Sequence, residues 1–116
     1  MIKNQLIYVA HPFGGDKANK CSIDTIMENL VMLDKNNTYL SPLHNFSMLY
    51  FDTQYSKGLK ICLDMLNKCD ALVLCGEWET SKGCIGEWSF AIAKGMPIYT
   101  WKEWTDKLKE QGDNSR

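Results

Sequence analysis

One run of residues, Asp70–Cys75, limits the fold of this chain more than any other feature. It reads Asp-Ala-Leu-Val-Leu-Cys, so an unbroken apolar stretch follows a single charged residue. A strand without polar alternation is typical of a parallel sheet, whose strands are covered on both faces. Parallel strands need long crossover connections, which are usually helices. The run therefore predicts an α/β domain.

Strands and helices alternate along the rest of the chain, as such a domain requires. The predicted strands are Gln5–Ala10, Thr38–Leu43, Asp70–Cys75 and Pro97–Trp101. The predicted helices are Asn19–Lys35, Ser56–Lys68 with Ser56 as its N-cap, Gly83 or Cys84 to Lys94, and Lys102–Gln111. Such alternation predicts three layers, in which helices flank a four-stranded parallel sheet of order 2-1-3-4. We expect a single domain over residues 1–111 and a polar tail over residues 112–116.

Composition excludes several functional classes. A net charge of −1 leaves no basic excess for binding a nucleic-acid polymer or a membrane surface. No apolar run approaches the roughly 20 residues that span a bilayer, and no signal-peptide core is visible. The five cysteines form no Cys-x-x-Cys pair, which favours reduced thiols. His11 and His44 complete no zinc-ligand cluster. We expect a cytoplasmic protein with no metal and no cofactor.

The strand order 2-1-3-4 places a topological switch between the first and third strands. Open α/β sheets bind ligands there, outside the carboxyl ends of the strands. Two loops, His11–Ala18 and Gly76–Lys82, lie at this point. The first contains Gly14-Gly15, which either lets backbone amides approach a phosphate or another electron-rich group, or simply turns the chain. Neither loop carries the glycine pattern of a dinucleotide site or a P-loop.

The second loop leads into a helix whose first turn is expected to contain Glu87. There the helix dipole is expected to lower the pKa of this carboxyl group and keep it ionised. A carboxylate beside a sugar can act as a nucleophile or stabilise an oxocarbenium-like centre. The alternative is an ordinary glutamate in the first turn of a helix. The indole of Trp78 can likewise stack on a base or pack in the core.

The segment His44–Tyr55 is a long loop rich in aromatic and apolar residues. Loops of this kind usually cover something, here the ligand. Together with four tryptophans, the segment predicts more apolar surface than a monomer of this size exposes. We therefore expect a homo-oligomer, a dimer or a tetramer.

These segments resemble the nucleoside 2-deoxyribosyltransferase-like superfamily. Residues Ile7–Gly15 are similar to its first strand and loop. Residues Cys69–Gly76, followed by Ser81–Glu87, are similar to its segment of strand, Ser-x-Gly-x-x-x-Glu and helix. The chain resembles most the small bacterial and phage proteins of the DUF4406 type. The resemblance spans nearly the whole chain in element order, whereas the specific motifs cover only these segments.

The resemblance implies a flavodoxin-like fold and an enzyme acting on the N-glycosidic bond of a (deoxy)nucleoside or nucleotide. In the superfamily, the glutamate matching Glu87 attacks C1′ of a deoxyribosyl group. The sugar then passes to another base in a transferase, or to water in a hydrolase. A neighbouring subunit often closes the site. The substrate contacts expected from the resemblance and from the second loop are Tyr8, His11, Pro12, Phe13, Gly14, Gly15, Trp78, Ser81 and Gly83.

One position departs from the superfamily pattern. The aspartate that helps to protonate the leaving base corresponds to Cys62, and Asp64 lies roughly 200° around the helix from that position. Loss of a general acid costs about 10²–10⁴ in rate. Three hypotheses stay open: an N-glycosidic enzyme, which is favoured; a non-catalytic protein that senses or sequesters a nucleotide; and a structural protein whose aromatic surface makes only oligomer contacts.

Overall fold

The structure is a computed structural model that describes residues 4–12, 17–42 and 55–114. Its elements are β1 (Leu6–Ala10), α1 (Lys17–Leu33), β2 (Thr38–Leu40), α3 (Tyr55–Asn67), β3 (Ala71–Leu74), the 3-10 helix η3 (Trp78–Thr80), α4 (Lys82–Lys94), β4 (Ile98–Thr100) and α5 (Trp101–Asn114). Among these residues, no helix combines the length and the apolar character needed to cross a bilayer.

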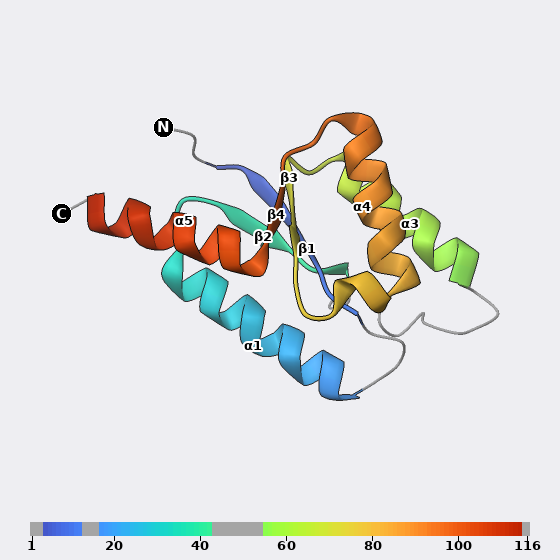
Figure 1. The fold of residues 1–116 in the computed structure, drawn as a ribbon, viewed down its shortest axis with the longest axis horizontal. Coiled ribbons are helices and arrows are strands. Elements are labelled where there is room, and N and C mark those ends of the chain that lie inside the picture. Colours follow the sequence, from blue (N-terminus) through green and yellow to red (C-terminus); the bar gives the residue numbers. More distant parts are fainter. Residues whose placement is uncertain (1–3, 13–16, 43–54, 115–116) are drawn as a thin grey trace.

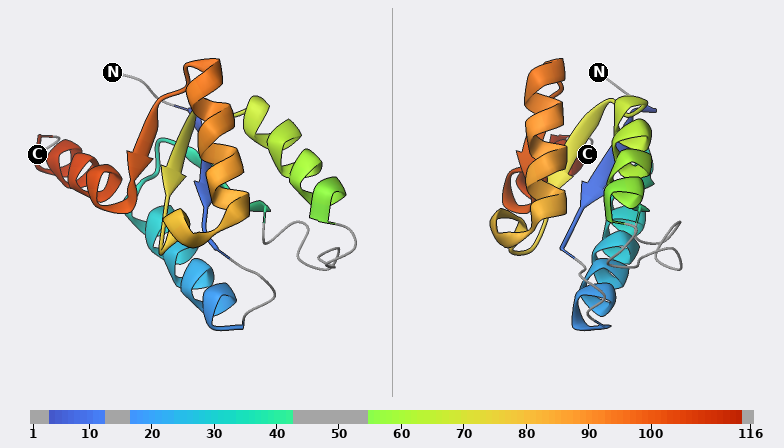
Figure 2. Two further views of the ribbon diagram at one scale, coloured as in Figure 1. Left: turned by 45° about the vertical axis from the view of Figure 1, so that its right-hand side comes forward. Right: turned by 90° about the vertical axis from the view of Figure 1, so that its right-hand side faces the viewer.

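The four strands form one sheet of order β2-β1-β3-β4, and every neighbouring pair is parallel. Helices α1 and α5 cover one face, and helices α3 and α4 cover the other (Figures 1 and 2). The predicted three-layer α/β fold with strand order 2-1-3-4 is therefore confirmed. In the two central strands, Ala10 pairs with Leu74, so β1 and β3 end side by side at the predicted switch point.

Side chains of β1 alternate between the two helical layers, as strand geometry requires. Ile7 and Val9 pack in the core beneath α1 and α5, whereas Tyr8 and Ala10 pack beneath α3 and α4. Strand β3 alternates in the same way, and all four of its residues are buried. Burial on both faces explains why the Asp70–Cys75 run carries no polar alternation.

Several boundaries differ from the sequence predictions. The second strand ends at Leu40, before Pro42, which has no N–H to donate to a ladder. Helix α3 begins at Tyr55, so Ser56 lies inside it and is not its N-cap. The predicted loop His44–Tyr55 lies outside the described residues, except for Tyr55 itself. Helix α5 continues to Asn114 and so includes residues 112–114 of the expected tail.

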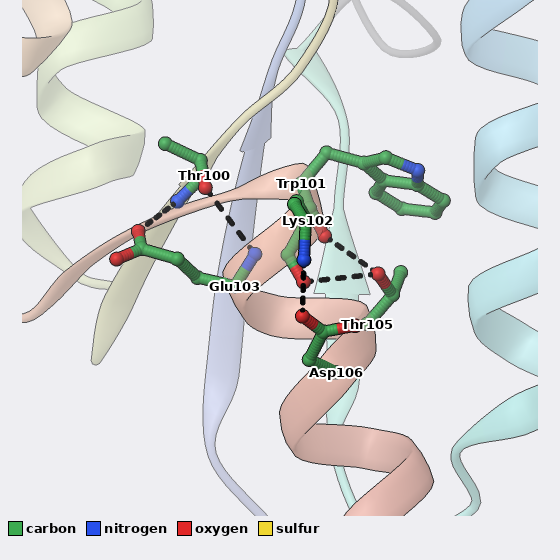
Figure 3. Close-up of polar contacts among 6 residues, drawn as sticks. All are labelled: Thr100, Trp101, Lys102, Glu103, Thr105 and Asp106. Carbon is green, nitrogen blue, oxygen red and sulfur yellow. Dashed lines mark hydrogen bonds and ion pairs between the residues drawn. The ribbon is translucent and has the colours of Figure 1, made fainter.

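Helix α5 starts directly after β4 because Thr100 and Glu103 form a capping box (Figure 3). The Thr100 N–H donates to Glu103 Oε1 at 2.8 Å, and the Glu103 N–H donates to Thr100 Oγ1 at 3.2 Å. Lys102 and Asp106 add an exposed ion pair one turn apart at 2.8 Å. The reciprocal cap satisfies orphan backbone groups at the helix start, so no connecting loop is needed.

A buried carboxylate fastens the amino edge of the sheet. Asp34, 6% exposed, accepts hydrogen bonds from the Asn36 N–H at 2.9 Å, the Asn37 side-chain amide at 2.8 Å and the Tyr39 hydroxyl at 2.5 Å. The Tyr39 oxygen in turn accepts from the Trp104 indole N–H at 3.0 Å. This network joins the end of α1, the edge strand β2 and helix α5.

Candidate functional site

Glu87 and Tyr8 form a buried hydrogen-bonded pair between the sheet and α4. Ser81 caps α4, accepting from the Cys84 N–H at 3.2 Å, which sets the helix start at Lys82. Glu87 therefore lies in the second turn, not in the first turn as predicted from the sequence. Its carboxylate accepts a hydrogen bond from the Tyr8 hydroxyl of β1. Glu87 is 6% exposed and Tyr8 is 0% exposed.

Burial decides the protonation of this pair. Desolvation raises the pKa of Glu87, and the hydrogen bond from Tyr8 offsets only part of that rise, so the pKa is about 7. The expectation that the helix dipole lowers the pKa and keeps Glu87 ionised is therefore wrong. The dipole acts within the first turn of a helix, and Glu87 lies beyond it. This carboxyl group is therefore expected to titrate near neutral pH.

Two thiols interact with Glu87: that of Cys62 on α3, which also interacts with Tyr8, and that of Cys84 on α4. Burial and the Glu87 charge raise the pKa of Cys62 to about 11 and that of Cys84 to about 12. Burial, the Glu87 charge and the Cys62 thiol also raise the pKa of Tyr8. Near neutral pH, these thiols and the phenol stay protonated, so Glu87 is the member of the cluster that titrates. Cys62, which interacts with Glu87, is thus a weakly acidic thiol.

His11 lies on the opposite face of the sheet. Its Nε2 is 3.0 Å from Ser22 Oγ on α1, and its Nδ1 is 2.7 Å from the Pro12 carbonyl oxygen. The ring also packs on Gly76, whose φ is +63° and where a Cβ would lie 2.9 Å from Nε2. The two loops predicted at the switch point do meet here. The imidazole, however, faces α1, whereas the Tyr8–Glu87 pair faces α4.

The remaining predicted contacts have varied surroundings. The Trp78 indole packs on Trp88 with ring centroids 6.0 Å apart, which is the packing alternative for that residue. The Ser81 hydroxyl is engaged as the cap of α4. A Cβ on Gly83 would have Ser81 Oγ at 3.9 Å as its neighbour, so space alone does not require a glycine there. The predicted contacts Phe13, Gly14 and Gly15 lie outside the described residues.

Ser22 is the contact that sequence reasoning missed. It lies in the second turn of α1, eleven residues after His11, and no motif connects the two. One signal was available, because side chains of a strand alternate in direction. His11 follows β1 with the same parity as Ile7 and Val9, which places its ring on the α1 face.

The fold and the buried pair define a small parallel α/β protein with a buried titratable pair between its sheet and α4. The model of the family DUF4406, described as a domain of unknown function, matches residues 5–100. The chain therefore belongs to the DUF4406 family, as its resemblance to these proteins implied. A comparison with curated proteins finds no match.

Proposed function

We propose that this protein acts on the N-glycosidic bond of a (deoxy)nucleoside or nucleotide, with Glu87 as the nucleophile. The observation that carries the proposal is the buried hydrogen bond from Tyr8 to Glu87. A carboxylate held in this way, on the helix that follows the central strand β3, has the chemistry that the superfamily resemblance expects at this position.

The reaction uses two displacements at one carbon. A Glu87 oxygen attacks C1′, the bond from C1′ to the base breaks, and a glycosyl ester forms on the carboxyl group. A second base or water then attacks C1′ and frees Glu87. The Tyr8 hydroxyl binds one carboxylate oxygen and so orients the other. The phenol is a positioning group in this scheme.

Proton supply limits the first displacement. The leaving base needs a proton, and the neighbouring thiols are weak acids because burial raises the pKa of Cys62 to about 11 and that of Cys84 to about 12. We therefore expect the base to take its proton from water. Such an enzyme is slower than one with a placed acid by about 10²–10⁴.

A second candidate function is nucleotide binding without turnover. It is favoured by the burial of Glu87, which is 6% exposed, and by the thiol of Cys62 near it. In this case the site retains a nucleotide that it senses or sequesters. Glu87 then accepts a hydrogen bond from a sugar hydroxyl when ionised, or donates one to it when protonated.

Base release distinguishes the two candidates. The purified protein is incubated with deoxynucleosides and their 5′-monophosphates, with and without a second base, and the products are separated by chromatography. We expect free base or an exchanged nucleoside, lost in Glu87→Gln and retained in Glu79→Gln, which changes an exposed carboxylate of η3. A nucleotide that raises Tm without turnover supports binding alone. No release and no Tm shift would rule out both functions.

A further inference from the structure

His11 has the hydrogen bonds of a general base. The Pro12 carbonyl oxygen, 2.7 Å from Nδ1, can only accept a hydrogen bond, so Nδ1 carries the ring proton. In the neutral ring, Nε2 then presents a lone pair. The Ser22 hydroxyl, 3.0 Å away, donates its proton to that lone pair. The tautomer of His11 and the direction of the Ser22 hydroxyl thus follow from one fixed acceptor.

Packing holds this arrangement in place. The imidazole is half-buried and lies against Gly76. A Cβ at that position would come within 2.9 Å of Nε2, and the positive φ would strain any residue other than glycine. Ser22 is exposed on the second turn of α1. The base is therefore partly covered, whereas the hydroxyl it contacts is open to a reagent from solvent. Nucleophile, base and orienting acceptor are the three parts of a serine-hydrolase triad.

We propose that Ser22 is a nucleophile, that His11 activates it, and that the Ser22 oxygen accepts an acyl group from an activated ester. Ser22 Oγ attacks the ester carbonyl, and its proton passes to His11 Nε2. As the bond from carbonyl carbon to leaving oxygen breaks, His11 returns that proton to the alcohol. The products are an acyl-serine and an alcohol, and water activated by His11 then releases a carboxylic acid. The site lies on the α1 face and does not use Glu87.

Covalent labelling of the full chain tests this assignment. Exposed Cys21 precedes Ser22, so the thiols are first blocked with N-ethylmaleimide. A fluorophosphonate probe is then added, the serine oxygen displaces fluoride at phosphorus, and fragment-ion mass spectrometry locates the adduct. We expect labelling at Ser22 that is at least ten times faster than at Ser89, an exposed serine of α4. Ser22→Ala should abolish this adduct, while Ser89→Ala should retain it.

Variants of the base separate activation from mere exposure. His11→Gln keeps a polar side chain but cannot take the proton, so labelling of Ser22 should slow by about 10²-fold. His11→Ala leaves space beside Gly76, and free imidazole should restore part of the rate. Thermal unfolding checks that each variant is folded. The assignment is overturned if Ser22 reacts no faster than Ser89, if folded His11→Gln labels at the wild-type rate, or if imidazole fails to accelerate folded His11→Ala.

Discussion

Replacing Glu87 by glutamine should remove a pH-dependent contribution to the stability of this domain. In the wild-type protein, burial raises the pKa of Glu87 from 4.5 to about 7. A group whose pKa is raised by folding stabilises the fold below its unfolded pKa, and this contribution disappears as pH rises through the folded pKa. Glutamine has nearly the same shape, can accept from Tyr8, and does not titrate in this range.

The size of the effect follows from the two pKa values. A rise from 4.5 to about 7 corresponds to about 3 kcal/mol between full protonation and full ionisation. Between pH 5 and pH 8 most of that contribution is lost, because Glu87 ionises across this interval. The stability of Glu87→Gln relative to wild type should therefore increase by between about 2 and 3 kcal/mol. For a domain of this size, such a change moves Tm by about 10 °C.

Urea unfolding at pH 5 and pH 8, followed by circular dichroism, measures this quantity. Comparing the variant with wild type at each pH removes the titration of the other groups. Glu79→Gln is the matched control, because an exposed carboxylate changes little in solvation on folding. An equal difference between Glu87→Gln and wild type at both pH values would show that Glu87 does not titrate there, and the burial argument would fail.

Three further substitutions test other contacts. Tyr8→Phe removes the donor to Glu87, so the pKa of that carboxyl should rise above 7 and stability at pH 8 should fall by about 1–3 kcal/mol; urea unfolding across pH shows both. Gly76→Ala should lower the free energy of unfolding by about 1–3 kcal/mol. Its effect should exceed that of Gly95→Ala, where φ is +79° but no atom lies within 4 Å of the added Cβ. Equal losses in Tm for the two variants would refute the proposed clash. Thr100→Ala should cost about 1 kcal/mol in urea unfolding through loss of the α5 cap, and an unchanged midpoint would contradict the role of the capping box.

The fold could be predicted because its main signal is local. An apolar run such as Asp70–Cys75 can be buried on both faces only in a covered parallel sheet, and the alternating pattern then fixes the crossovers. Boundaries were less predictable, since they depend on individual hydrogen bonds. The Thr-x-x-Glu sequence at Thr100–Glu103 was visible in the chain, and it would have placed the start of α5 correctly.

Sequence reasoning singled out both members of the buried pair, Tyr8 and Glu87, but it did not predict the electrostatics of that pair. The sequence placed Glu87 on the helix after the third strand, although in its first turn instead of its second, and its burial depends on how α3 and α4 pack over β1. Desolvation from that packing outweighs the hydrogen bond from Tyr8, so the pKa of Glu87 rises instead of falling as predicted. The homo-oligomer and the cytoplasmic location stay predictions. The exposed apolar side chains Val31, Met32 and Leu33 at the end of α1 are ones that such an oligomer could cover.

The Asp34 network stabilises one end of the sheet, and the proposed reacting groups lie outside it. Strand β2 has three residues and borders the sheet, so its ladder alone is a weak attachment. The Asp34 carboxylate strengthens this attachment, because its hydrogen bonds link β2 to α1 and, through Tyr39, to α5 near the amino ends of the strands. None of the proposed reacting groups belongs to this network. Substitutions that strengthen or weaken this network can therefore change the free energy of unfolding, and with it the lifetime of the protein, without changing the proposed sites.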